Sequence, residues 1–322
     1  MNWMPELLEA LQREFSRTAE GRTNALYDPV RYFLDLGGKR MRPALTLLGC
    51  QLFQDDWNPA LPPALAVEIF HNFTLVHDDI MDEAPLRRGK ETVHTKWNAN
   101  QAILSGDAML VLAYQEFAAC SPELQAALLP LFNQTALEVC EGQQMDMDFE
   151  ERSDVTVGEY LEMIRLKTSV LLAAALQMGA ITAGASEADQ RRIYQFGQDM
   201  GLAFQLRDDY LDAFGTADFG KQVGGDILCD KKTYLLIRAF EKAGSSERAV
   251  LDTYIGQPVT NGDQKVAAVK EVMTTLAVQT ELLQLSDEYY AKALNHLDHI
   301  SVDEGRKVRL RELAAWLMQR TT

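Results

Sequence analysis

Apolar residues recur at helical spacing through almost the whole chain of 322 residues. Breaks between these stretches carry ordinary helix signals, such as Gly37-Gly38 at an end and Ser121-Pro122-Glu123 at a start. No segment alternates with the period of two that is typical of strands. The pattern predicts an all-α protein of long helices around a central core. We expect helices over residues 3–20, 25–36, 42–54, 61–82, 98–119, 123–149, 156–183, 186–214, 231–243, 263–298 and 302–319.

Composition favours one large domain. Hydrophobic residues make up 47% of the chain, which is ample for a single core at this length. No linker, repeat or low-complexity tract divides the sequence, although the length alone would permit two domains. We therefore expect residues 1–322 to form a single domain.

Charge and cysteine content exclude several classes of protein. A formal net charge of −16 argues against a nucleic-acid partner, which requires a basic face. Uninterrupted apolar runs such as Val170 to Leu176 are too short to span a membrane, and the N-terminus does not resemble a secretory signal. The four cysteines are scattered, as expected for free thiols in a reducing cytoplasm.

Two acidic motifs share the spacing DDxxD, and each follows an apolar helical segment. Residues four apart on a helix lie one turn apart on the same face, so each motif brings three carboxylates together. Two such charges about 4 Å apart repel by roughly 4 kcal/mol at an effective dielectric near 20, and a bound cation relieves this. Oxygen ligands favour Mg²⁺. One copy alone is more often a solvated acidic face, but two copies predict Mg²⁺ held by two helices to bind a diphosphate. The candidate ligands are Asp78, Asp79, Asp82, Asp208, Asp209 and Asp212.

Local basic clusters are the other condition for binding a phosphorylated ligand, because the net charge would repel it. Any one cluster is explained by solubility, but several lie close to motif-like segments. His71 lies about two turns before Asp78 on nearly the same helical face. A lone histidine on an apolar helix is more often a core residue than a ligand contact. The clusters are Lys39-Arg40 with Arg42, Arg87-Arg88 with Lys90, Lys167, Lys221 and Lys231-Lys232.

These segments, in this order, resemble the trans-isoprenyl diphosphate synthases of the polyprenyl synthetase family. The resemblance covers most of the chain and implies the isoprenoid synthase fold, an orthogonal bundle of long helices around a central active-site cavity. The segments that carry it are Gly37 to Pro43, His71, Asp78 to Asp82, Leu86 to Gly89, Gly142 to Asp146, Lys167-Thr168, Phe204 to Asp212, Lys221 and Asp230 to Thr233.

The resemblance implies head-to-tail condensation of isopentenyl diphosphate with an allylic diphosphate. The allylic diphosphate ionises, the double bond of isopentenyl diphosphate attacks the carbocation, and a proton is lost. In the family, the two acidic motifs hold three Mg²⁺ ions on the leaving diphosphate, which Arg87, Lys167 and Lys231 also contact. By the same correspondence, isopentenyl diphosphate is held by Lys39, Arg42, His71 and Arg88. Thr168 and Gln205 would line the carbocation, and Lys221 would contact phosphate on closure.

Product length is expected to depend on the residues just before the first motif. In the family, positions four and five before it form the floor of the product tunnel; here they are Thr74 and Phe73. One aromatic residue with no insertion in the motif resembles geranylgeranyl diphosphate synthases. A farnesyl diphosphate synthase is the alternative.

Two other readings remain open from the sequence. A class I terpene cyclase shares the all-α fold and one DDxxD motif, but it lacks the second copy and the GGKRMRP segment. A non-catalytic synthase subunit would commonly have lost one motif, and both are intact here. The family is usually homodimeric, so we also expect a homodimer.

Overall fold

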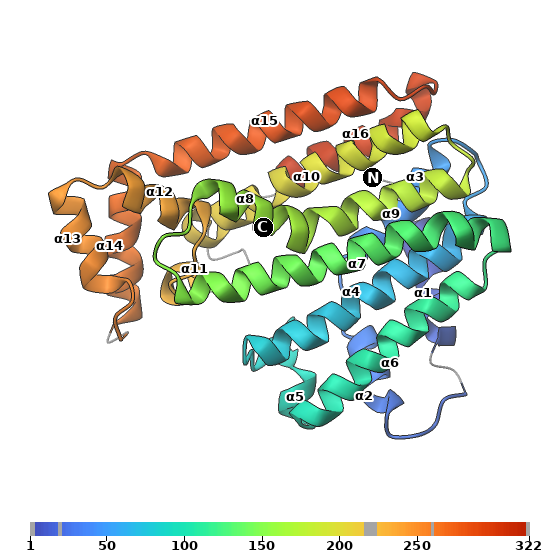
Figure 1. Cartoon of the computed structure of the whole chain (residues 1–322), viewed down its shortest axis with the longest axis horizontal. Coiled ribbons are helices and arrows are strands. Elements are labelled where there is room, and N and C mark those ends of the chain that lie inside the picture. The colour runs from blue at the N-terminus through green and yellow to red at the C-terminus, as the bar shows by residue number, and fades with distance from the viewer. Residues whose placement is uncertain (1–3, 19–20, 216–223, 259–260, 320–322) are drawn as a thin grey trace. The chain divides into compact units, whose positions relative to one another are not determined.

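The computed structural model describes residues 4–18, 21–215, 224–258 and 261–319. Lys221, a predicted phosphate contact, lies outside these residues. The all-α prediction is confirmed: helices dominate, and the described residues hold a single two-stranded sheet (Figure 1). The chain forms two compact units. The first comprises residues 1–133, 174–193 and 301–309, and the second comprises residues 134–173, 194–300 and 310–322.

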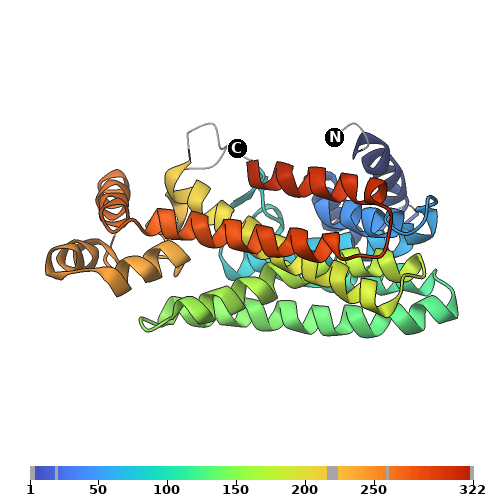
Figure 2. The ribbon, with the colours of Figure 1, turned by 90° about the horizontal axis from the view of Figure 1, so that it is seen from above.

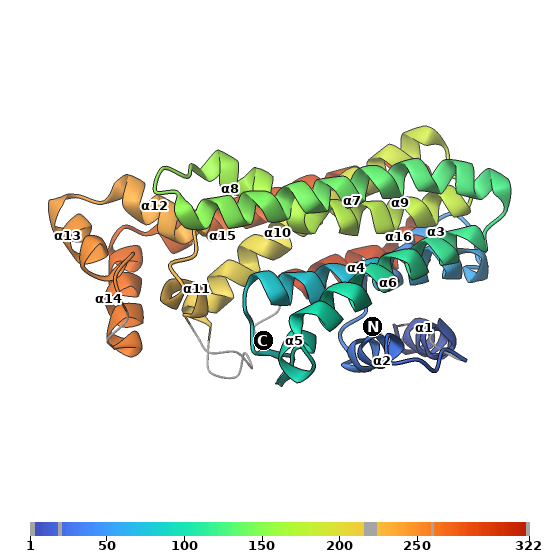
Figure 3. The same cartoon turned by 60° about the horizontal axis from the view of Figure 1, so that its bottom comes forward.

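The first unit is built on two helices that lie side by side, α4 (Leu61–Met81) and α6 (Ala99–Ala118) (Figure 3). The buried residues of α4 include apolar side chains over most of its length, which explains why periodicity predicted this helix well. The other elements are α1 (Met4–Thr18), α2 (Tyr27–Asp35), α3 (Met41–Gln51), η1 (Asn58–Ala60), β1 (Leu86–Arg87), β2 (Lys90–Glu91) and α5 (Val93–Lys96).

The second unit is organised along α10 (Glu187–Phe214) and α15 (Val278–Asp298). Within this unit the two helices run together (Figure 2), and Ser286 donates a hydrogen bond to the carbonyl of Ala203 at 2.9 Å. The remaining helices of the unit are α8 (Val157–Ile164), the π-helical turn η2 (Arg165–Ser169), α11 (Gly225–Leu228), α12 (Tyr234–Lys242), α13 (Ser245–Tyr254) and α14 (Gly262–Thr275). Three further helices supply residues to both units: α7 (Pro122–Glu151), α9 (Val170–Thr182) and α16 (Glu304–Gln319), as does α10 itself.

One predicted helix, over residues 263–298, was wrong. Residues 263–298 form two helices, α14 and α15, which are separated where Ala277 adopts a left-handed conformation with φ of 56°. Lys242 donates a hydrogen bond to the carbonyl of Leu276 at 2.6 Å and forms an ion pair with Glu281. This lysine comes from α12, so the contact that stabilises the break is remote in sequence.

The short elements were not predicted. A hairpin joins β1 to β2, with Leu86 paired to Glu91 and Arg87 to Lys90. Its turn residues, Arg88 and Gly89, have φ of 54° and 75°, as a type I′ turn requires. The helices α5, α11 and α13 were also missed, and α12 begins at Tyr234 rather than at residue 231.

One helical stretch, Val157–Thr182, is long and apolar enough to cross a membrane by length and composition. However, 67% of its most apolar window is buried inside the protein, as in the core helix of a soluble protein.

Candidate functional site

The first unit gathers positive charge around His71 on α4. The ring of His71 lies 2.9 Å from the guanidinium of Arg42, measured from Nε2 to Nη1. Burial lowers the pKa of His71 well below 6.5, and the nearby guanidinium groups lower it further. The guanidinium groups that act on His71 are those of Arg42, Arg88, Arg87 and Arg40. We call Arg42, His71 and Arg88 the basic cluster, because Arg40 and Arg87 have other partners.

The positive charge of Arg42 is destabilised by burial. Burial lowers its pKa from 12.5 to about 10; the carboxylate of Glu68 opposes the shift, and Arg88 adds to it. An arginine whose charge is disfavoured by its surroundings is well suited to bind an anion, because the anion restores the missing counter-charge. Arg42 and neutral His71 are therefore suited to bind an anion such as phosphate.

Arg88 is aimed by the hairpin turn and by the glycines before α3. Its guanidinium donates a hydrogen bond to the carbonyl of Gly37. Gly38 has φ of +131°, and a Cβ there would lie 2.8 Å from Cζ of Arg88. Gly38 thus allows the close approach of this side chain, whereas a Cβ at Gly37 would meet no atom within 4 Å. Lys39 follows them at an exposed position.

Arg40 plays a different part from its neighbours in the same motif. Its guanidinium forms an ion pair with Glu68 at 2.6 Å, and the two side chains are only 7% and 3% exposed. It also donates to the carbonyl of Leu34 and lies over the ring of Phe15, 4.8 Å from its centroid. Arg40 is therefore committed to internal contacts.

The first acidic motif lies at the end of α4, next to Arg87. The Nε of Arg87 donates to Oδ1 of Asp79 at 2.7 Å, and its Nη2 donates to Oδ2 of Asp78 at 3.2 Å. Asp79 is buried, and its Oδ2 has no hydrogen-bond partner. Burial raises the pKa of Asp79, although Arg87 opposes this. Asp82 is exposed, and its amide donates to the carbonyl of Asp78 at 2.9 Å.

The two predicted chain-length residues have different surroundings. The ring of Phe73 lies 4.7 Å from the ring of His77 and 5.6 Å from that of Phe70, centroid to centroid. The hydroxyl of Thr74 donates to the carbonyl of His71 at 2.8 Å. Phe73 therefore belongs to a row of aromatic side chains on α4, while Thr74 is bound to the backbone of its own helix.

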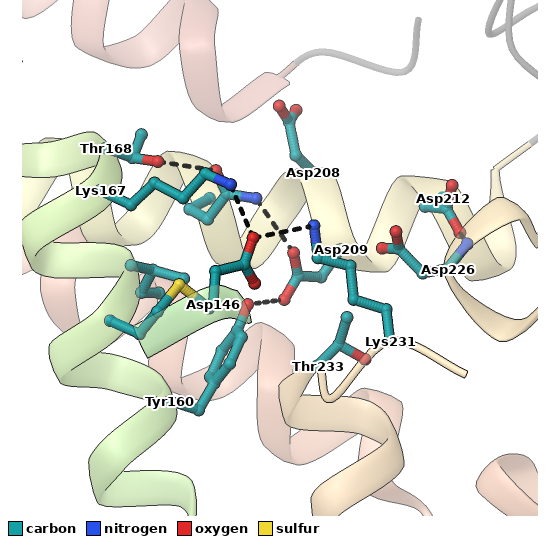
Figure 4. A pocket seen from close by; sticks show the side chains of 13 residues that line it. Asp146, Tyr160, Lys167, Thr168, Asp208, Asp209, Asp212, Asp226, Lys231 and Thr233 are labelled. Carbon is teal, nitrogen blue, oxygen red and sulfur yellow. Dashed lines mark hydrogen bonds and ion pairs between the residues drawn. The ribbon is translucent and has the colours of Figure 1, made fainter. Parts of the chain in front are cut away.

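The second unit contains a pocket of about 260 Å³ around the second acidic motif (Figure 4). It brings together the predicted site residues of this unit that the structure describes: Lys167, Thr168, Gln205, Asp208, Asp209, Asp212 and Lys231. Six more residues line it, namely Asp146, Tyr160, Met163, Ile164, Asp226 and Thr233. The sequence therefore predicted which residues lie together in this pocket, but it did not predict the contacts among them.

Asp209 is the buried member of this motif. The hydroxyl of Tyr160 donates to its Oδ2, and the amide of Gln205 donates to its Oδ1 at 3.1 Å. Burial raises the pKa of Asp209 to about 8, with a further contribution from the charge of Asp226. The charge of Lys231 opposes this shift, and with no metal ion bound a pKa of about 8 favours the protonated form of the carboxyl group at pH 7.

Asp146 connects the two lysines of the pocket. Its Oδ2 lies 2.6 Å from Nζ of Lys167 and 3.8 Å from Nζ of Lys231 (Figure 4). Burial raises the pKa of Asp146, but the two ammonium groups outweigh burial and hold it below its usual range. Lys167 comes from the π-helical turn η2, and Lys231 comes from the turn before α12. Both lysines are thus positioned by irregular backbone.

Sequence reasoning missed Asp226 and Tyr160. The backbone amide of Asp226 donates to Oδ2 of Asp212 at 3.0 Å, which holds α11 beside the second motif. The available signal was its position between the second motif and Lys231. Tyr160 had no such signal, because it follows an ordinary helix start at Thr156.

The donor set of the pocket fits a hard divalent cation. Five aspartates and two lysines line it, so acidic groups are in excess. The raised pKa of Asp209 reflects this excess, which a bound cation would relieve. In the first unit, the orphaned Oδ2 of Asp79 indicates the same need. Among the described residues, however, no three acidic, histidine or cysteine side chains are already arranged as a metal site.

Comparison with known proteins agrees with this chemistry. The polyprenyl synthetase family model matches residues 23–275. The geranylgeranyl pyrophosphate synthase of Geoglobus acetivorans is 38% identical over 303 residues, which covers 94% of this chain and 92% of that protein. The geranylgeranyl diphosphate synthase of Methanosarcina mazei is 37% identical, with 93% and 91% covered.

A solved structure of a geranylgeranyl pyrophosphate synthase is also similar. It has 46% sequence identity and a TM-score of 0.95, and the match covers 100% of both chains. This likeness confirms the isoprenoid synthase fold that the resemblance implied. The chain therefore belongs to the polyprenyl synthetase family and is a prenyltransferase.

Proposed function

We propose that this enzyme condenses isopentenyl diphosphate with an allylic diphosphate, in the presence of Mg²⁺, to form all-trans geranylgeranyl diphosphate. The observation that carries the proposal is the unequal environment of the cationic residues. Arg42, His71 and Arg88 form a basic cluster centred on His71, whereas Lys167 and Lys231 stand among carboxylates. Two diphosphates of different character, one without metal and one with it, match these two environments.

Isopentenyl diphosphate is assigned to the basic cluster. Arg42 supplies forked donors that fit phosphate oxygens, and Arg88 adds a second guanidinium from the hairpin. Neutral His71 accepts from Arg42 at Nε2, because a guanidinium can only donate, so the ring proton lies on Nδ1, which remains a donor for phosphate. Lys39 adds a charge at the exposed side.

The allylic diphosphate is assigned to the acidic motifs with their lysines. Lys167 and Lys231 are held in place by Asp146, and each places an ammonium group in the pocket as a point charge for phosphate. Arg87 adds a forked donor beside the first motif. Mg²⁺, when bound by the aspartates of the motifs, would supply Lewis-acid stabilisation of the departing diphosphate. That both motifs hold one diphosphate stays a prediction from the sequence.

The lining near Lys167 suits a carbocation. Thr168 donates to the Oε1 of Gln205 at 3.5 Å, and the amide of Gln205 donates to Asp209. These groups are dipoles without a strong nucleophile, so they can face positive charge without being alkylated. We assign Thr168 and Gln205 to this role.

The twenty-carbon product rests on the relatives and on Phe73. The two relatives named above, and the solved structure, are geranylgeranyl synthases by name. Phe73 presents one aromatic ring, packed by Phe70 and His77, at the predicted floor position. Thr74, the neighbouring position, is small, which favours the longer product. A fifteen-carbon product is the second candidate.

We also propose that the enzyme is a cytoplasmic homodimer. The helix α6 exposes Leu104 and Val111, at 55% and 58%, two turns apart on one face. Exposed apolar residues in a row on one helix are typical of a surface that another subunit covers.

The experiment is product analysis. The purified enzyme is incubated with isopentenyl diphosphate, Mg²⁺ and dimethylallyl, geranyl or farnesyl diphosphate in turn, and products are identified by mass spectrometry. Geranylgeranyl diphosphate should accumulate, and chelation of Mg²⁺ should stop its formation. No pyrophosphate release with any primer would contradict the function, and farnesyl diphosphate as the final product would contradict the product length.

A further inference from the structure

One wall of the pocket in the second unit is a short segment, residues 224–231, which we call the α11 segment. It supplies Asp226 and Lys231 to the pocket lining. The segment is compact, because the amide of Lys231 donates to the carbonyl of Asp226 at 2.9 Å. Its four-residue helix is too short to be stable alone, so its position depends on what lies behind it.

A buried lysine lies behind this segment. Lys265, on α14, is 2% exposed, and its Nζ lies 2.6 Å from Oδ1 of Asp230. The same ammonium group donates to the carbonyl of Leu228 at 3.2 Å. Both partners belong to the α11 segment, and Asp230 is the residue directly before Lys231. Lys265 does not line the pocket itself.

Two further contacts fix the same segment. Gly224 has φ of +84°, and a Cβ there would lie 2.7 Å from Val266, the residue after Lys265. At the other end, Oδ2 of Asp230 accepts a hydrogen bond from the amide of Gly256 at 3.0 Å. Asp230 itself adopts a left-handed conformation, with φ of 54°. The segment therefore rests on α14 at its start and is tied by Asp230 at its end.

A buried ion pair contributes little to stability compared with apolar residues of the same size. The ion pair does, however, hold the backbone around each of its two residues in one position. We propose that Lys265 is a positioning residue for the allylic diphosphate site. Through Asp230 and Leu228 it sets the place of Lys231 and Asp226, and this role rests on the function proposed above.

The test compares K265M with a matched control, K307M. Lys307 on α16 is also 2% exposed, and it forms an ion pair with Glu304 at 2.8 Å, but it belongs to the first unit. K265M should lower kcat/KM for the allylic substrate by roughly tenfold to a hundredfold, as expected for a misplaced contact residue. The KM for isopentenyl diphosphate should change by less than about twofold. K307M should lower the Tm without changing the allylic kcat/KM. Equal losses for both variants, or equal effects on both substrates, would overturn the proposal.

Asp230 provides an independent check. If Lys265 acts through Asp230, the double variant K265M/D230N should lose no more allylic kcat/KM than the worse single variant. Additive losses would contradict the mechanism. K265R should recover part of the activity that K265M loses, because its guanidinium can still pair with Asp230. If K265M does not fold, D230N takes its place, and an unchanged allylic kcat/KM in D230N would overturn the proposal.

Two readouts do not depend on turnover. Hydrogen–deuterium exchange of a peptide covering residues 225–233 should be faster in K265M than in the wild type and unchanged in K307M. Calorimetry with inorganic pyrophosphate and Mg²⁺ should show weaker binding in K265M alone. If the wild type makes no prenyl product, the proposed function fails, while exchange and pyrophosphate binding still decide whether Lys265 holds the site. Unchanged hydrogen–deuterium exchange in K265M would refute the positioning role of Lys265.

Discussion

Two arginines in one short motif should respond in opposite ways to the same substitution. Arg40 and Arg42 both belong to the segment from Gly37 to Pro43. Arg40 is buried against Glu68, whereas Arg42 meets His71 in the basic cluster. We predict that R40M destabilises the protein and that R42M mainly weakens binding of isopentenyl diphosphate.

The magnitude for Arg40 follows from its burial. Removing one partner of a buried ion pair leaves an uncompensated charge and costs about 3–5 kcal/mol. Here the remaining group is Glu68, whose side chain is 3% exposed. R40M should therefore lower the free energy of unfolding by about that amount. The double variant R40M/E68L should regain most of it, because no charge is then left buried.

Substitution of Arg42 should have the opposite effect on the free energy of unfolding. Its folded pKa is about 10 rather than 12.5, chiefly because of burial, so folding is penalised while the side chain is charged. The penalty is fully present at pH 7 and is lost only as the pH rises through about 10. After a discount for partial exposure it amounts to about 1–3 kcal/mol. R42M should thus be at least as stable as the wild type at pH 7.

Binding distinguishes the two variants further. A hydrogen bond to a charged partner contributes about 1.5–3 kcal/mol, so R42M should raise the KM for isopentenyl diphosphate roughly tenfold or more. R40M, measured on its folded fraction, should leave that KM within about twofold. Urea unfolding and steady-state kinetics are the assays. A stability loss in R42M equal to that in R40M, or an equal rise in KM, would refute the assignment.

Four other outcomes are expected. F73A should lengthen the product seen by mass spectrometry, and an unchanged product distribution would remove Phe73 as the floor. The KM for isopentenyl diphosphate should show no titration near pH 6.5 beyond that of the substrate's own phosphate, because the pKa of His71 lies well below that value. An inflection in the wild type that is absent in H71N would contradict a neutral His71. Mg²⁺ with pyrophosphate should raise the Tm more at pH 8.5 than at pH 6.5, because Asp209 has a pKa of about 8 and must release its proton; an equal rise would argue against its participation. Light scattering should show that L104E/V111E is monomeric, and an intact dimer would place the interface elsewhere.

The main helices could be predicted because their signal is local. Apolar periodicity in α4 or α10 needs no knowledge of the rest of the chain. The break at Ala277 could not be predicted in this way, since Lys242 of α12 stabilises it through the carbonyl of Leu276 and through Glu281. The hairpin carrying Arg88 is too short for any alternation to appear.

Residue types at the site were also predictable, but their partners were not. DDxxD spacing identified the carboxylates, and resemblance to the family identified the lysines. Neither could separate Arg40 from Arg42, because their difference lies in what α4 presents to each: Glu68 to one and His71 to the other. Asp226 was missed for the same reason, as its role depends on α11 folding back to Asp212.

The two acidic motifs are identical in spacing yet differ in chemistry. In the first, Asp79 accepts a charged donor from Arg87, which opposes the effect of burial on its pKa. In the second, Asp209 accepts hydrogen bonds from the neutral groups of Tyr160 and Gln205, and burial raises its pKa to about 8 although the charge of Lys231 opposes the shift. A metal ion that binds Asp209 must displace the proton that a pKa of about 8 favours at pH 7, whereas Asp79 already accepts a hydrogen bond from a charged group. Metal binding by the second motif should therefore depend more steeply on pH, a difference set by the neighbours of each motif rather than by its own residues.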